Sequence, residues 1–263
     1  MDNDEFTKFI WQKSRELYRE MPWRKNPTFY NVLVSEIMLQ QTQVSRALVK
    51  FEEFMKRFPA IDQLANESLA DVLRTWQGLG YNRRAKYLHE TAKLVVRDGR
   101  PMTKVECMRF PGVGENTAGA IMAYVYNQPE VFIETNIRTV YLYHFFANRT
   151  DVTDRELRER VAGTIDHEHP REFYWALMDY GTWLKASGVR NIAASKHHMK
   201  QAPLKGSVRE VRGQIIRVFS RGRLTQTELS RSVVADERFS GALDELKREG
   251  LVESCDTYLR LTK

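Results

Sequence analysis

The spacing of apolar residues predicts helices through the first two thirds of the chain. The apolar face of the first predicted helix consists of Phe6, Phe9, Ile10 and Leu17. Further helical faces fall between residues 32 and 54, and breakers at 58–59 and 98–101 separate the helices. No alternating run of β-branched residues precedes residue 250. The first part of the chain is therefore predicted to be all-α.

A different pattern begins at residue 202, where a Pro-Leu-Lys-Gly-Ser stretch interrupts the helices. Three short helices are then predicted, over 208–219, after a Thr225/Glu228 capping box, and over 241–249. Alternation at 251–253 and 258–261 predicts a two-stranded hairpin. This order is typical of a winged helix, a module that binds DNA or docks proteins. We expect two domains, residues 1–201 and 202–263.

The distribution of charge favours a polyanionic partner without identifying it. The 263 residues carry a net charge of +7, with a pI near 9.3. Residues 182–223 hold ten lysines and arginines against a single acid, Glu210, so the rest of the chain is close to neutral. Such a basic segment suits a surface that contacts phosphates, and it equally suits a solvated linker.

Composition also limits the cofactors and the compartment. Cys107 and Cys255 are the only cysteines, so one chain cannot form a disulfide framework or an all-cysteine zinc or iron–sulfur site. The sequence has no uncharged apolar run of about 18 residues, and its first five residues are acidic where a signal peptide is basic. We expect a cytoplasmic, nucleoid-associated protein that requires no cofactor.

The turn Phe110-Pro111-Gly112-Val113-Gly114 is the strongest single motif. Backbone amides of Gly112, Val113 and Gly114 can face a phosphate without obstruction by large side chains, and the helix that resumes at Thr117 favours an anion at its N-terminus. Pro-Gly pairs also mark ordinary turns. The carboxylate that follows, Glu134, makes a DNA-binding turn next to a reactive group the better interpretation.

Four segments together resemble a known family. Pro22-Trp23-Arg24, residues 34–44, residues 76–81 and the turn at 110–114 occur in the order typical of helix-hairpin-helix DNA glycosylases. The sequence is similar in particular to adenine glycosylases of the MutY type, with mismatch thymine glycosylases and endonuclease III as further relatives. The resemblance implies an all-α, two-lobed helix-hairpin-helix glycosylase fold, here followed by the winged helix.

The candidate catalytic residues are two carboxylic acids. Glu36 lies in an apolar helix, where burial raises the pKa of a carboxyl group, and the resemblance implies that it protonates the departing base. Glu134 stands where the family has a catalytic Asp that stabilises the sugar cation. Asn116 stands where lyase members carry a Lys, so we expect base removal without efficient strand cutting.

The resemblance also implies the binding residues. Trp23, Arg24, Asn116 and Asp179 are expected at the base pocket. The expected DNA contacts are Gln40, Gln41 and Thr42 from one loop, Leu79 and Tyr81 as a wedge, the hairpin residues already named, and the basic residues Lys196 and Lys200, which would replace a family iron–sulfur loop. Carbonyl groups of Met108, Phe110 and Val113 match a monovalent-cation site of the family.

The function expected from the sequence is hydrolysis of the bond between deoxyribose and a mismatched or damaged base in double-stranded DNA. Adenine opposite oxidised guanine is the first choice of substrate. Thymine or uracil opposite guanine is the second, because two features depart from the MutY type. These are the sequence Glu134-Thr135-Asn136 and the winged helix, which stands where MutY-type enzymes have a domain that recognises oxidised guanine. A non-catalytic lesion sensor is a third reading. We expect a monomer whose winged helix can dock partners.

Overall fold

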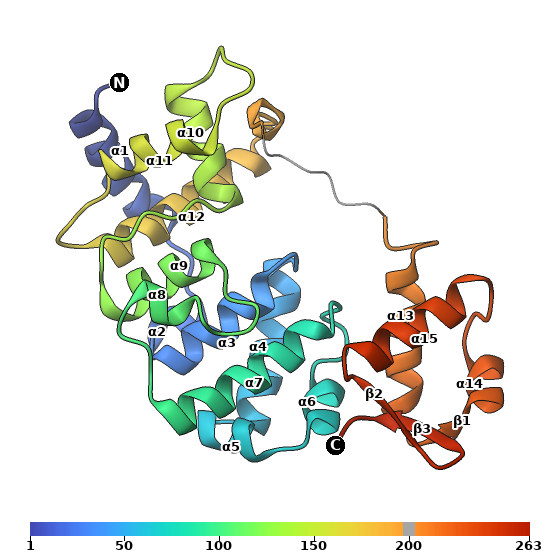
Figure 1. Cartoon of the computed structure of the whole chain (residues 1–263). Helices are drawn as coiled ribbons and strands as arrows, with labels where there is room; N and C mark the ends of the chain where they lie inside the picture. Colours follow the sequence, from blue (N-terminus) through green and yellow to red (C-terminus); the bar gives the residue numbers. More distant parts are fainter. Residues whose placement is uncertain (197–202) are drawn as a thin grey trace. The chain divides into compact units, whose positions relative to one another are not determined.

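The computed structural model describes residues 1–196 and 203–263, and helices dominate it (Figure 1). Contacts between residues divide the chain into two compact units. The first unit contains residues 1–36, 101–109 and the described part of 113–200. The second contains residues 37–100, 110–112 and the described part of 201–263. Helix α3 (Phe29–Leu39) runs from the first unit into the second.

Helix α12 is the centre of the first unit. Besides the start of α3, this unit contains α1 (Asn3–Leu17), α2 (Pro22–Lys25), α8 (Lys104–Cys107), α9 (Glu115–Tyr126), α10 (Thr135–Phe145), α11 (Asp154–Ala162), α12 (Pro170–Ala186) and η1 (Ile192–Ala194). Helix α12 packs against both α1 and α10. The fully buried rings of Phe6 and Tyr141, 5.1 Å apart, lie in this core. Burial of such rings supplies most of the stabilisation here.

The second unit contains a group of helices whose interior includes an aromatic cluster. These helices are α4 (Val44–Arg57), α5 (Ile61–Asn66), α6 (Leu69–Thr75) and α7 (Arg83–Asp98). The rings of Phe58 and Trp76 both pack on Phe54, and all three side chains are buried. The Trp76 indole N–H donates to the Gly80 carbonyl at 3.1 Å, so the turn after α6 is fixed to this core.

The C-terminal part of the second unit is a winged helix. It consists of α13 (Val208–Phe219), β1 (Leu224–Thr225), α14 (Gln226–Ser232), α15 (Arg238–Arg248), β2 (Val252–Cys255) and β3 (Tyr258–Leu261). Helices α13 and α15 pack together, and an antiparallel sheet in the order β1-β3-β2 follows. The predicted Thr225/Glu228 capping box is present. Gly250, at φ +66°, ends the last helix as predicted.

The predicted fold class is confirmed, and two local predictions were wrong. The wing has a third strand, because β1 pairs with β3; a two-residue strand is too short to show an alternating pattern. The third helix of the winged helix begins at Arg238 and not at Gly241. The Asp236 carboxylate accepts a hydrogen bond from the Arg238 backbone N–H at 3.0 Å, which satisfies one of the donors of the first turn.

Gly181 allows α10 and α12 to approach closely. A Cβ atom at position 181 would lie 2.5 Å from the Asn136 carbonyl oxygen, a distance that requires backbone movement. We expect Gly181→Ala to lower the free energy of unfolding by about 1–3 kcal/mol. Gly241→Ala is the matched control, since nothing lies near its Cβ position, and it should be neutral or stabilising. Chemical denaturation measures both; equal stabilities would contradict the close packing.

Candidate functional site

Glu134 caps the N-terminus of α10 with its own side chain. Its Oε1 accepts hydrogen bonds from the backbone N–H groups of Asn136 and Ile137 at 2.6 and 3.0 Å. The Asn136 side-chain amide is 3.4 Å from Oε2. Glu134, one position before the helix, is thus the N-cap residue of α10, and Asn136 lies in its first turn. This arrangement favours a negative charge at Glu134.

Glu36 lies on α3 among buried apolar side chains. Val32, Leu33 and Ile37 are at most 2% exposed, while Glu36 itself is partly buried. Burial, followed by the charge of Glu134, raises the pKa of Glu36 to about 8. A carboxyl with this pKa is mostly protonated at neutral pH. The predicted rise is thus found, and the two predicted catalytic acids lie within each other's electrostatic influence.

The environment of Glu134 differs from that of Glu36. Burial raises the pKa of Glu134, but the two backbone N–H groups, the Asn136 amide and the Lys185 ammonium all oppose this rise. Burial lowers the pKa of Lys185, on α12, although the negative charge of Glu134 partly offsets this effect. Hydrogen-bond donors and a nearby cation favour the ionised form of Glu134. The pair is therefore best described as one neutral acid and one carboxylate.

Tyr124 of α9 borders the same pair. It is 7% exposed, and burial together with the charges of Glu36 and Glu134 raises its pKa well above the ordinary value. The phenol therefore stays neutral. Its ring stacks on Trp175 of α12 at 6.2 Å. The sequence did not single out Tyr124, because an aromatic residue within an apolar helix is an ordinary core residue.

Arg24 and Asp179, both predicted at the base pocket, bind each other. Arg24 makes two hydrogen bonds to the Asp179 carboxylate, at 2.7 and 3.0 Å, and Arg19 adds two more, from its side chain at 2.7 Å and from its backbone N–H at 3.1 Å. Both Arg24 and Asp179 are buried, and Trp175 lies against the guanidinium of Arg24. This bidentate pair joins α2 to α12, next to the predicted pocket residue Trp23, which is 8% exposed.

The glycine-rich turn between α8 and α9 has the expected local form. Gly112 has φ +74°, and Gly114 is the N-cap residue of α9. Val113 is buried, Gly112 and Gly114 are exposed, and Thr117 is half-buried. The Asn116 side-chain oxygen accepts a hydrogen bond from the Ile133 N–H at 3.2 Å, which ties the start of α9 to the segment before Glu134.

The part of the chain that the structure describes has no cluster of acidic, histidine or cysteine side chains suited to a metal ion. Within residues 1–196 and 203–263, no three or more His, Cys, Asp or Glu side chains are grouped to hold a metal ion. Cys107 is buried beside Met122, and Cys255 lies on β2. A cation at the carbonyl groups of Met108, Phe110 and Val113 stays a prediction.

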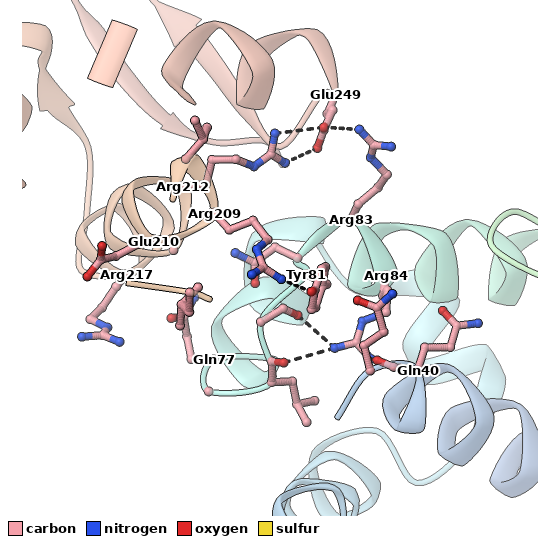
Figure 2. Close-up of a pocket in the computed structure, with 18 of the residues that line it drawn as sticks. Gln40, Gln77, Tyr81, Arg83, Arg84, Arg209, Glu210, Arg212, Arg217 and Glu249 are labelled. Carbon is pink, nitrogen blue, oxygen red and sulfur yellow. Dashed lines mark hydrogen bonds and ion pairs between the residues drawn. The ribbon is translucent and has the colours of Figure 1, made fainter. Parts of the chain in front are cut away.

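A single buried guanidinium holds two predicted DNA-contacting loops together (Figure 2). Arg84, at the start of α7, donates to the carbonyl groups of Ile37, Met38, Gln40, Leu79 and Gly80 and to the hydroxyl of Thr42, at 2.5 to 3.2 Å. It caps the end of α3 and fixes the turn after α6. Burial lowers its pKa to about 10, so it remains charged.

Both loops contain a residue in a left-handed conformation. Gln41 has φ +55° and Tyr81 has φ +47°, which is uncommon for residues other than glycine. Such conformations persist only where surrounding contacts impose them, and they concentrate at functional sites. Gln40 donates to the Gly112 carbonyl at 3.1 Å, which links this loop to the hairpin turn. Leu79 is only 3% exposed, so insertion of Leu79 into DNA would require the turn to open.

The basic segment is only partly described. Lys196 is exposed, and its backbone N–H donates to the Val152 carbonyl at 3.1 Å. Lys200 lies outside the described residues. The predicted contact of both lysines with DNA stays a prediction.

Comparison with known families agrees with this arrangement of motifs. Residues 34–163 match the profile described as "HhH-GPD superfamily base excision DNA repair protein". The chain belongs to this superfamily. The matched residues include Glu36, the hairpin turn and Glu134, which are the features of the site described above.

In none of the described helices is there a segment both long and apolar enough to cross a membrane.

The curated relatives of this superfamily member carry the name adenine DNA glycosylase. One from Buchnera aphidicola subsp. Baizongia pistaciae is 34% identical over 190 residues, which is 69% of this chain and 54% of that protein. One from Mycobacterium tuberculosis is 36% identical over 172 residues, 62% of this chain and 56% of that protein. The chain thus matches only about half the length of these relatives.

Solved structures show the same fold at low sequence identity. A thermostable thymine-DNA glycosylase has a TM-score of 0.61 at 18% identity, covering 91% of this chain and 97% of that one. A trapped endonuclease III–DNA intermediate has a TM-score of 0.59 at 14% identity, covering 70% and 87%. At such identities the likeness establishes the fold.

Replacement of Arg84 by lysine should loosen both loops of this superfamily member. One ammonium cannot reach the carbonyl groups now bound by a guanidinium, and buried carbonyl groups without a donor cost stability. We expect Arg84→Lys to lower the free energy of unfolding by about 3 kcal/mol and to speed hydrogen exchange around Gln41 and Tyr81. Arg97→Lys on the same helix is the control, because Arg97 pairs only with Asp98 at the surface among described residues. Equal effects of the two substitutions would contradict this role.

Proposed function

We propose that the chain is a DNA glycosylase that removes a mismatched or damaged base from double-stranded DNA. The observation that carries the proposal is the pair formed by Glu36, whose pKa is raised to about 8, and Glu134, whose carboxylate is capped by donors. Two acids held in opposite protonation states suit cleavage of an N-glycosidic bond. Superfamily membership of residues 34–163 supports the same reaction.

In the proposed reaction the two acids act at opposite sides of the bond. Glu36 gives its proton to a ring nitrogen of the base, and the bond between C1′ and the base breaks with its electron pair leaving on the base. The Glu134 carboxylate stabilises the positive charge that develops on the sugar. Water then adds to C1′ and releases a proton. The extra methylene of Glu134 is accommodated by the helix cap, which fixes its carboxylate.

The proposed enzyme is monofunctional. A lyase reaction needs an amine that forms a Schiff base with the sugar, and Asn116 has none. Lys185, whose pKa is lowered and which lies within the electrostatic influence of Glu134, is the amine that could support slow strand cutting.

The remaining sequence predictions describe how DNA is held. Exposed backbone at Gly112 and Gly114 is proposed to bind a phosphate at the start of α9. The loop at Gln40–Thr42 is proposed to enter the duplex beside the extruded nucleotide, and the turn with Leu79 and Tyr81 is proposed to act as a wedge on the opposing strand. Extrusion of a base costs a few kcal/mol, and inserted side chains offset part of this cost.

Adenine opposite oxidised guanine is the first candidate substrate, because the curated relatives are named adenine DNA glycosylases. Thymine or uracil opposite guanine is the second candidate. It is favoured by Glu134 in place of Asp, and the structural neighbour with the larger coverage is named a thymine-DNA glycosylase. A binding-only lesion sensor is the third, since Glu replaces the expected Asp.

The test is release of a base under single-turnover conditions from duplexes with adenine opposite oxidised guanine, or with thymine or uracil opposite guanine. Heating in alkali reveals the abasic site. We expect Glu36→Gln and Glu134→Gln each to lower the rate about 10²–10⁴-fold. The wild-type rate should fall as the pH rises through about 8, because Glu36 then loses its proton.

Glu159→Gln is the control, because Glu159 is exposed and pairs with Arg155 at the surface. It should release the base at the wild-type rate. Tight binding without release from any duplex would contradict the enzyme and favour the sensor. Undiminished release by Glu36→Gln would contradict the role of Glu36.

A further inference from the structure

A large cavity lies within the second unit, and neither predicted catalytic acid is among its lining residues (Figure 2). Its volume is about 1120 Å³. One side consists of the two loops that Arg84 holds, with Gln40, Gln77 and Tyr81, and the other consists of α13 with Arg209 and Arg217. This volume exceeds the usual range of small-molecule pockets, about 300–1,000 Å³, which suits an extended ligand.

Helix α13 is fastened beside these loops by one glutamate. The Glu249 carboxylate, just after α15, accepts hydrogen bonds from Arg212 of α13, at 2.5 and 3.0 Å, and from Arg83 of α7. The Lys86 ammonium donates to the Glu249 carbonyl at 2.5 Å. Arg212 also binds Glu245 at 2.7 Å. These contacts fix the winged helix against α7, and they use the acids at the end of α15 (Figure 2).

The cavity has a positive charge after its internal ion pairs are taken into account. Glu245 and Glu249 are bound by Arg212, and Glu210 lies 3.7 Å from Arg238. Arg46 and Arg217 are exposed, and neither makes an ion pair with a carboxylate among the described residues. Two guanidinium groups thus line the cavity without a carboxylate partner in the part of the chain that the structure describes, which favours an anionic ligand.

Other lining groups match nucleotide chemistry. The Arg209 guanidinium hydrogen-bonds the Tyr81 hydroxyl and lies 5.2 Å from the centre of its ring. Aromatic rings and guanidinium groups are both surfaces on which bases stack. The amides of Gln40 and Gln77, which donate to the Gly112 and Leu73 carbonyl groups, also line the cavity and are polar groups of the kind that meet base edges. Phosphate-binding arginines, a stacking surface and amides together are the features of a single-strand site.

We propose that this cavity binds a DNA strand as it passes the Tyr81 turn, with its phosphates at Arg46 and Arg217. The winged helix thereby contacts DNA through its first helix, α13. The acids on α15 and just after it disfavour contact with phosphates there, and two of them, Glu245 and Glu249, already bind Arg212 of α13. The inference rests on the proposed function only in taking DNA as the ligand.

The test measures binding of the full chain to a duplex with a non-hydrolysable abasic analogue, as a function of salt concentration. We expect Arg217→Gln and Arg46→Gln each to weaken binding several-fold. Each should reduce the slope of log K against log salt by about 0.9, the value for one phosphate contact. Arg231→Gln is the matched control, because Arg231 lies on α14 outside the cavity and is exposed, and it should leave the slope unchanged.

The outcomes separate this inference from the proposed function. If Arg46→Gln and Arg217→Gln leave the salt slope unchanged and base release is intact, the proposed binding of DNA in the cavity is wrong. The proposed glycosylase activity is then unaffected. If the slopes are reduced but no base is released from any duplex, DNA binding in the cavity is supported and the proposed glycosylase activity is contradicted. An equal loss in Arg231→Gln would assign the effect to overall charge, and failure of the wild-type chain to bind the duplex would overturn the inference.

Discussion

Two carboxyl groups that share a partly buried region are the constraint on which the account depends. Two like charges cannot both ionise there without cost, so one proton is retained. The retained proton resides on Glu36, because apolar side chains surround it on α3. Glu134 has backbone N–H donors and a nearby ammonium, which favour its ionised form. The difference in surroundings assigns the acid and the carboxylate.

Much of the first unit serves to keep these surroundings in place. Gly181 permits α12 to lie against the first turn of α10, where Glu134 is the cap. The Arg24–Asp179 pair fixes α2 to the same helix. In the second unit, Arg84 has a comparable role for the loops around Gln41 and Tyr81. Each contact is a short-range device that restricts backbone groups close to a predicted functional residue.

The sequence was sufficient for features that depend on local periodicity. The helical class, the winged helix and its Thr225/Glu228 cap follow from apolar spacing and capping chemistry, and the structure contains all three. Glu36 could be singled out because it interrupts an apolar face, whereas Glu134 was named from its match to the family's catalytic Asp. Features that depend on contacts between segments far apart in the sequence could not be predicted. The role of Glu134 as a cap needs backbone geometry, and the strand β1 exists only because β3 lies beside it.

Arg84 was not predicted as an important residue, although its position in the sequence indicates a structural role. It falls on the buried face of α7 together with Leu88, Ala92 and Val95, at helical spacing. An arginine on an apolar face must bind several acceptors, so a structural role was open to inference. Which carbonyl groups it binds, and that they belong to two loops, depends on tertiary contacts that no local pattern encodes.

The most direct test is a titration of the individual glutamate side chains by carbon-13 NMR, in the wild type and in Glu134→Gln. The account predicts a pKa near 8 for Glu36 in the wild type and a lower value in the variant, since the opposing charge is removed. An ordinary pKa near 4.5 for Glu36, unchanged by Glu134→Gln, would contradict it.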